Sequence, residues 1–139
     1  MRIGLCLALL LLAAPAWAQK AAVTKPEPVK PAAPAEPTPL PYDPQLLRLA
    51  EIMGTLAYLR PLCAASDGEQ WRAKMAAIID SEATTPARRQ RLAGAYNHGF
   101  RGYEITYRTC TANAEAIIAR FLDEGTRLAH EIGNRYSGG

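Results

Sequence analysis

Seven prolines between positions 26 and 41 restrict most strongly how this chain can fold. Residues 19–41 are otherwise mainly alanine, lysine and glutamate, so this stretch can bury no apolar core and should form an extended, semi-rigid linker. The linker is either a spacer that holds a domain away from a membrane or wall, or a solvated tail without a binding role. Only residues 42–136 then remain for one small domain, followed by a short flexible tail at 137–139.

The N-terminus has the three-part layout of a secretory signal peptide. Arg2 supplies a short positive region, residues 3–14 form an uncharged apolar run, and small residues precede an expected cleavage site after Ala18. About 12 apolar residues are too few to cross a hydrocarbon core of about 30 Å as a helix; the alternative is an uncleaved N-terminal anchor. We therefore expect residues 1–18 to be removed and the mature chain to be exported to the periplasm, without a transmembrane span.

The composition argues against nucleic acid as a partner and favours a disulfide bond. Loss of Arg2 leaves 15 basic against 13 acidic residues, a net charge of +2, whereas nucleic-acid-binding proteins usually carry a strongly basic surface. Loss of Cys6 leaves Cys63 and Cys110, and two cysteines in a small exported domain are expected to pair. A bridge between positions 47 residues apart (110 minus 63) contributes about 4 kcal/mol in the chain-entropy description.

Four helices are predicted in the domain. The first begins at Asp43-Pro44, an N-cap followed by proline, and ends near Arg60 because Pro61 stops it. Its apolar residues cover about half of its circumference, which is typical of a helix that is central in a bundle or covered by a partner. The other helices are expected from Ser66 or Asp67 to about Ala83, from Thr85-Pro86 to about Thr109, and from Thr111 to about Arg135.

Short loops favour an up-down-up-down order, in which the first and third helices end at the same pole, directly before the two cysteines. The fourth helix carries an apolar seam at alternating spacings of four and three, suited to left-handed packing at about 20°. The predicted fold class is therefore all-α: a disulfide-stapled four-helix up-down-up-down bundle after a signal peptide and a Pro-rich linker. Whether the third helix is continuous stays open, because Gly94, Gly99 and Gly102 indicate either close helix approach or a break.

Two surfaces of the domain are candidates for binding. Four aromatic residues of the third helix, Tyr96, Phe100, Tyr103 and Tyr107, fall within an arc of about 80°. They indicate either an aromatic groove for a peptide or glycan, or a tyrosine-rich core with hydrogen-bonded hydroxyls. The domain's basic residues are nearly all arginine, which suits bidentate binding of carboxylates or phosphates, or else forms an ion-paired, solvated face. The candidate interaction surface comprises Arg88, Arg89, Arg91, Arg101 and Arg108.

No catalytic or metal-binding site is expected. His98 and His130 map to outward faces of their helices at levels about 10 Å apart, whereas zinc ligands converge within about 2.3 Å of the ion. Glu104 and Glu115 are the nearest approach to a carboxylate pair, and both are expected to be exposed. The sequence contains no phosphate-binding loop, serine-nucleophile motif or covalent haem attachment motif. We therefore expect no cofactor and no enzymatic activity.

Several fragments of the domain together resemble one family. They are Tyr42-Asp43-Pro44-Gln45-Leu46-Leu47-Arg48-Leu49, Tyr58-Leu59-Arg60-x-Leu62-Cys63, Trp71-Arg72, and above all Tyr96-Asn97-x-Gly99-Phe100-Arg101-Gly102-Tyr103-x-x-Thr106-Tyr107-x-x-Cys110-Thr111. The resemblance is to small exported alphaproteobacterial proteins with a helical domain of unknown function, and it covers about residues 42–136. It implies a signal peptide, a variable linker and one helical domain. It also supports the cysteine pairing and transfers no catalytic residue.

The leading functional expectation is a non-enzymatic periplasmic interaction module. It would present its arginine-rich and aromatic surfaces to an envelope protein or to peptidoglycan. The export signal, the linker, the apolar face of the first helix and the lack of a catalytic set motivate this interpretation. The alternative is a periplasmic carrier that holds a small ligand between its helices, in a pocket lined by Tyr96, Tyr103 and Tyr107. The sequence leaves the partner, the biological process and the oligomeric state open.

Overall fold

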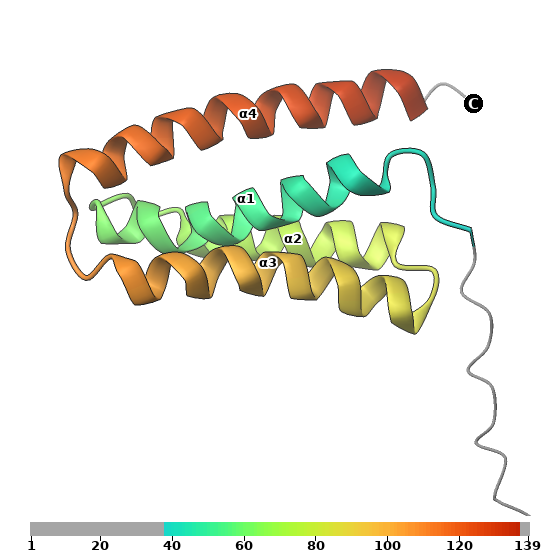
Figure 1. The fold of residues 1–139 in the computed structure, drawn as a ribbon, viewed down its shortest axis with the longest axis horizontal. Coiled ribbons are helices and arrows are strands. Elements are labelled where there is room, and N and C mark those ends of the chain that lie inside the picture. The colour runs from blue at the N-terminus through green and yellow to red at the C-terminus, as the bar shows by residue number, and fades with distance from the viewer. Residues whose placement is uncertain (1–37, 137–139) are drawn as a thin grey trace, which may run out of the picture. The chain divides into compact units, whose positions relative to one another are not determined.

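The computed structural model describes residues 38–136, which form four α-helices (Figure 1). They are α1 (Asp43–Leu62), α2 (Gly68–Glu82), α3 (Pro86–Thr106) and α4 (Ala112–Tyr136). Successive helices run in alternating directions, so that α1 and α3 end at the same pole (Figure 1). The predicted signal peptide, most of the predicted linker and the tail lie outside the described residues, and export to the periplasm stays a prediction.

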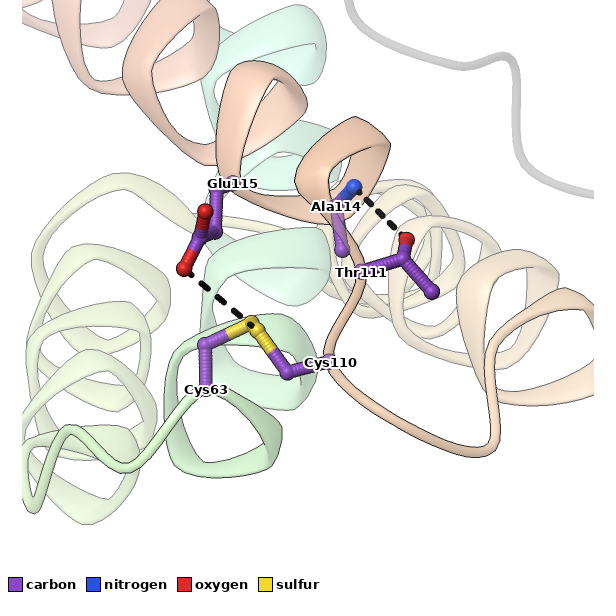
Figure 2. Close-up of a disulfide and its surroundings, with 5 residues drawn as sticks. All are labelled: Cys63, Cys110, Thr111, Ala114 and Glu115. Carbon is purple, nitrogen blue, oxygen red and sulfur yellow. Dashed lines mark hydrogen bonds between the residues drawn. A yellow bond between two sulfur atoms is a disulfide. The ribbon is translucent and has the colours of Figure 1, made fainter.

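Threonine residues cap two of the helices, as predicted. The Thr85 hydroxyl accepts a hydrogen bond of 3.2 Å from the backbone N–H of Arg88 at the start of α3. The Thr111 hydroxyl accepts one of the same length from the backbone N–H of Ala114 at the start of α4 (Figure 2). Proline follows Thr85 in α3, at a position where its missing N–H would have had no partner within the helix. These local signals fix where α3 and α4 begin.

Both ends of α1 differ from the prediction. Tyr42 occupies the cap position, and the Asp43 carboxylate instead accepts a hydrogen bond of 3.0 Å from the backbone N–H of Leu40. Pro61 does not stop the helix, which continues to Leu62 with the proline in its final turn. Proline lacks the backbone N–H that would bond four residues back and crowds that carbonyl, and α1 ends one residue after it.

Helix α1 lies at the centre of the bundle and carries most of its buried core. It packs against all three other helices, whereas the Cα atoms of α4 come within 8 Å of those of α1 and of no other described helix. Helix α1 therefore lies between α4 and the pair formed by α2 and α3 (Figure 1). The wide apolar face of α1 is almost fully buried, and its buried members are Leu46, Ala50, Ile52, Met53, Leu56, Ala57 and Leu59.

Two glycines allow α1 and α3 to pack closely. A Cβ atom added at Gly54 would lie 1.9 Å from the carbonyl oxygen of Tyr96, and one added at Gly99 would lie 2.0 Å from the carbonyl oxygen of Glu51. Each glycine thus faces the backbone of the opposite helix. The fully buried Thr55 lies beside Gly99, and its hydroxyl donates a hydrogen bond of 3.1 Å to the Glu51 carbonyl. Any side chain at Gly54 or Gly99 would have to push the two helices apart.

Helix α3 runs unbroken through its three glycines and ends at Thr106, about three residues before its expected end. Of these glycines, only Gly99 lies in close contact with another helix. A Cβ atom added at Gly94 or Gly102 would meet nothing within 4 Å. Close helix approach therefore explains Gly99, and the other two glycines neither break the helix nor pack against a neighbour.

The pole where α1 and α3 end is held by the two cysteines. Cys63 and Cys110 lie at disulfide distance, with their Cα atoms 4.9 Å apart, so the predicted pair does meet (Figure 2). Ala64 follows Cys63 with a φ of 65°, in the left-handed conformation that commonly closes a helix. The Glu115 carboxylate of α4 lies 3.9 Å from the Cys110 sulfur. The bridge therefore joins the end of α1 to the segment that leads into α4.

The opposite pole contains a buried network of charges. Arg88 of α3 is 6% exposed and forms an ion pair with Asp43 of α1. Its Nε donates a hydrogen bond of 2.7 Å to the Glu82 carbonyl, and its Nη2 lies 3.3 Å from the Glu82 carboxylate. That carboxylate also accepts a hydrogen bond of 2.9 Å from the Tyr42 hydroxyl, and burial together with this bond raises the pKa of Tyr42. One network therefore joins the starts of α1 and α3 to the end of α2.

Candidate functional site

The aromatic residues in the middle of α3 take part in helix packing. Tyr96 packs against the core cluster that contains Met53. Burial raises the pKa of Tyr96, and the neighbouring positive charge of Arg72 lowers it by less. Phe100 contacts Tyr58 of α1 edge-on, with ring centroids 5.4 Å apart. Both side chains of α3 are thus directed toward neighbouring helices.

Tyr103 and Tyr107 link α3 to α4 instead. Tyr103 contacts Phe121 of α4 edge-on, with ring centroids 5.9 Å apart, and stacks on Tyr107 at the same centroid distance. Burial is the main cause that raises the pKa of Tyr103. The Tyr107 hydroxyl accepts a hydrogen bond from the Asn113 side chain. The four candidate aromatic residues therefore contact different neighbours and do not line one groove.

The assignment of Arg88 to an interaction surface is wrong. Its side chain is buried, and its charge is already engaged by Asp43 and Glu82. The sequence places Arg88 beside other arginines, but it does not reveal that Asp43, 45 residues earlier, comes to lie against it. Arg88 therefore contributes to the stability of the fold rather than to an exposed surface.

The other candidate arginines are dispersed. Arg89 is exposed and lies 3.3 Å from the Asp80 carboxylate, and Arg91 is half-buried. Arg101 is exposed but lies about 18 Å further along α3 than Arg89, because it comes twelve positions later and each position advances the helix by about 1.5 Å. Arg108 is exposed beyond the end of α3. These four residues therefore do not form a single cluster.

An apolar groove that the sequence did not reveal lies between α1, α2 and α4. It has a volume of about 440 Å³. It exists because α4 approaches α1 alone and leaves a space beside α2. The groove is lined by Leu49, Ile52, Met53 and Leu56 of α1, by Trp71, Lys74, Ala77 and Ile78 of α2, and by Phe121, Leu122, Gly125, Thr126 and Ala129 of α4.

Small residues keep the groove open. Ala77 of α2 and Gly125 and Ala129 of α4 stand where longer side chains would fill the space. A Cβ atom added at Gly125 would lie 3.4 Å from Ile52, so this glycine borders the floor of the groove. The sequence of α4 shows an apolar seam at alternating spacings of four and three, which predicts left-handed helix packing and does not predict a groove.

The lining of the groove carries one charge. Lys74 is the only charged lining residue, and it forms no ion pair with any of residues 38–136. Its Nζ lies 5.0 Å from the centroid of the Trp71 ring, in a cation–π contact. The Trp71 indole N–H donates a hydrogen bond of 3.1 Å to Asp67, which in turn accepts two from Arg60 at 2.6 and 2.8 Å. The tryptophan ring is thus held in place beside the groove.

A bidentate ion pair fixes the wall of the groove that α4 provides. Arg48 of α1 donates hydrogen bonds of 2.7 and 3.1 Å to the two carboxylate oxygens of Glu124. These bonds lower the pKa of Glu124 and raise that of Arg48. Arg48 also lies 2.9 Å from Glu51 within α1, so its guanidinium is engaged by carboxylates of both helices.

Acid should weaken this attachment of α4 to α1. Because the folded-state pKa of Glu124 lies below its ordinary value of 4.5, the pair stabilises the fold above that value, and the stabilisation is lost as pH falls through the folded-state pKa. Both side chains are partly exposed, so we expect a contribution of about 1 kcal/mol at neutral pH. Urea unfolding of the wild type and Glu124→Gln should differ by this amount near neutral pH and converge in acid; a pH-independent difference would contradict the assignment.

The described residues offer no site for metal chemistry. No group of three His, Cys, Asp or Glu side chains among residues 38–136 could hold a metal ion. His98 lies on the surface, 3.2 Å from Glu51, and His130 is exposed on α4. No helix in this part of the chain is both long enough and apolar enough to cross a membrane.

Comparison with known proteins identifies a family without a known activity. No curated protein and no solved structure matches the chain. A family profile described as "Protein of unknown function (DUF2385)" matches residues 41–136, which include all four helices. The alphaproteobacterial origin and the export that the sequence resemblance implied stay predictions. The chain belongs to the DUF2385 family, a family of proteins of unknown function.

Proposed function

We propose that the protein is a non-enzymatic interaction module of the cell envelope, and that its groove between α1, α2 and α4 binds an amphipathic helix of an envelope protein. The observation that carries the proposal is this open, apolar groove with helices on both sides. The envelope location rests on the predicted signal peptide and linker. The binding surface differs from the arginine and aromatic surfaces expected from the sequence, whose members are dispersed or engaged in packing.

The length of the groove fits a short stretch of helix. Its lining runs from Leu49 to Leu56 along α1 and from Trp71 to Ile78 along α2. The ends of each stretch are seven positions apart, or about 10.5 Å along a helix. An amphipathic helix that binds in a groove uses anchors at positions i, i+3 or i+4, and i+7, which span the same distance. A partner helix in this groove would extend the helix-on-helix packing of the bundle.

The open rim favours a helix over a small ligand. Lys74, Ala77, Thr126 and Ala129 line the groove and are nevertheless exposed to solvent. Small-molecule sites usually bury about 70–90% of their ligand, whereas these exposed rim residues leave the groove open along one side. An amphipathic helix needs to bury only its apolar face and keeps its polar face in water. The apolar lining likewise favours a protein segment over peptidoglycan, which is rich in polar groups.

Filling the groove should abolish binding of the partner. Ala77→Leu adds apolar atoms within the groove, whereas Ala76→Leu adds the same atoms at a neighbouring exposed position that does not line it. After crosslinking in intact cells and affinity purification, the wild type and Ala76→Leu should recover the same envelope protein. Ala77→Leu should recover it at least about tenfold less, which corresponds to about 1.4 kcal/mol.

Two results would count against the proposal. Equal recovery by all three proteins, each with an unchanged helical circular dichroism spectrum, would show that the partner binds elsewhere. Recovery of this chain alone from wild-type cells would remove the envelope protein as the occupant of the groove.

A further inference from the structure

A second cavity adjoins the apolar groove. It has a volume of about 260 Å³ and lies between the end of α1 and the start of α4. Its lining includes Cys63 and Glu115, the two side chains that Figure 2 shows on either side of the disulfide's sulfur atoms. Leu122 lines both cavities, so the second one continues the first along α4. We call the two together the α4 trough. It follows α1 from Leu49 to Cys63 and α4 from Glu115 to Ala129.

The length of the α4 trough sets the length of its occupant. The first and last residues of each wall are 14 positions apart (63 minus 49 and 129 minus 115), or about 21 Å along a helix, which is close to four helical turns. We infer, on the basis of the proposed function, that the trough binds a single amphipathic helix of about four turns with an acidic residue beside Lys74. The site would then reach from the middle of α2 to the disulfide.

Charge supports the acidic residue in the partner helix. Arg60, which lines the second cavity, is already paired with Asp67 at 2.6 Å. Lys74 contacts the Trp71 ring and has no acidic partner among the described residues. An acidic side chain at the margin of the bound helix would pair with Lys74 while remaining partly in contact with water. Such a rim pair adds selectivity at little cost of desolvation.

Crosslinks from the two ends of the trough test the length of the occupant. A photoreactive amino acid would replace Ala129, which lines the groove, or Ala119, which lines the second cavity, in the full chain in cells. Both alanines are exposed on α4 and lie ten residues apart (129 minus 119), or about 15 Å. Mass spectrometry should find both crosslinks in one segment of one partner, about ten residues apart. The same probe at Ala76, outside the trough, should not label that segment.

The other outcomes separate the two proposals. A crosslink to the partner from position 129 but not from 119 would overturn the four-turn site and leave the proposed function intact. Lipid adducts, or crosslinks only between copies of this chain, would overturn both. No crosslink from either position, while the partner is still recovered by chemical crosslinking, would also overturn both, because the partner would then bind outside the trough.

Charge reversal at Lys74 tests the acidic residue. Lys74→Glu should lower the yield of the crosslink from position 129 at least about tenfold, because the acidic partner side chain would then face a like charge. Lys74→Arg, which keeps the positive charge, should restore the yield to within about twofold of the wild type. An unchanged yield for Lys74→Glu would show that the bound helix carries no acidic residue at this point.

Discussion

Gly99→Ala should lower the free energy of unfolding by about 3 kcal/mol, the upper end of the usual cost of overpacking. The added methyl group would meet the backbone carbonyl of Glu51 at 2.0 Å, and a backbone cannot move aside as a flexible side chain can. Gly54→Ala should have a similar effect, because its methyl group would meet the Tyr96 carbonyl. For a domain of this size the melting temperature should fall by about 12–24 °C, as measured by circular dichroism or calorimetry.

The same helix provides matched controls. Gly94→Ala and Gly102→Ala add the same methyl group where nothing lies within 4 Å. Each should raise the free energy of unfolding by up to about 1 kcal/mol, because alanine is the better helix former. If Gly99→Ala were as stable as these controls, the close packing of α1 on α3 would not be correct.

Arg88→Met should cost about 3–5 kcal/mol, because it leaves the buried Asp43 carboxylate without its charge partner. The double variant Asp43→Leu/Arg88→Met should be more stable than Arg88→Met, since it removes both charges from the buried site. Urea unfolding of the wild type, the two single variants and the double variant would measure the coupling between the two side chains.

An exposed neighbour serves as the control for Arg88. Arg89→Met removes an arginine that is 52% exposed and lies 3.3 Å from Asp80, so it should change the free energy of unfolding by less than about 0.5 kcal/mol. Equal effects at the two positions would mean that Arg88 is solvated, and that its place in the candidate interaction surface should be restored.

Local features of the fold were predictable from the sequence because their causes are local. Thr85-Pro86 and Thr111 carry their capping chemistry in a few consecutive residues, and the structure confirms both helix starts. The wide apolar face of α1 likewise indicated a central helix. The meeting of Cys63 and Cys110 followed from the order of the helices and the short loops between them.

Features that depend on how helices meet were not predictable in the same way. The contact between Arg88 and Asp43 requires the starts of α1 and α3 to come together, and no local sequence pattern around either residue predicts this pairing. Gly54 and Gly99 lie on the faces where α1 and α3 meet, whereas Gly94 and Gly102 lie on faces of α3 that meet no neighbouring atoms. The sequence does not distinguish the two kinds of glycine.

The candidate site was missed for a related reason. A seam of apolar and small residues along α4 predicts a covered face, but it does not say how many helices cover it. In the structure, the backbone of α4 lies close to that of α1 alone, and one side of α4 lines the groove. Three tyrosines on one stripe of the third helix predicted an aromatic groove or a tyrosine-rich core. In the structure, Tyr103 and Tyr107 stack on each other near α4.

Trp71 offers the most direct test of the groove as the binding surface. Of the chain's two tryptophans, Trp17 lies in the signal peptide that we expect to be removed, so the mature chain grown with 5-fluorotryptophan should give one fluorine NMR signal, from Trp71 in the lining of the groove. Addition of the recovered envelope protein should change the chemical shift of this signal. The chemical shift should also no longer depend on whether the solvent is water or heavy water, because the partner covers the Trp71 ring. The control variant Ala76→Leu should show the same two changes. A complex that forms while the Trp71 signal stays unchanged would contradict binding in the groove.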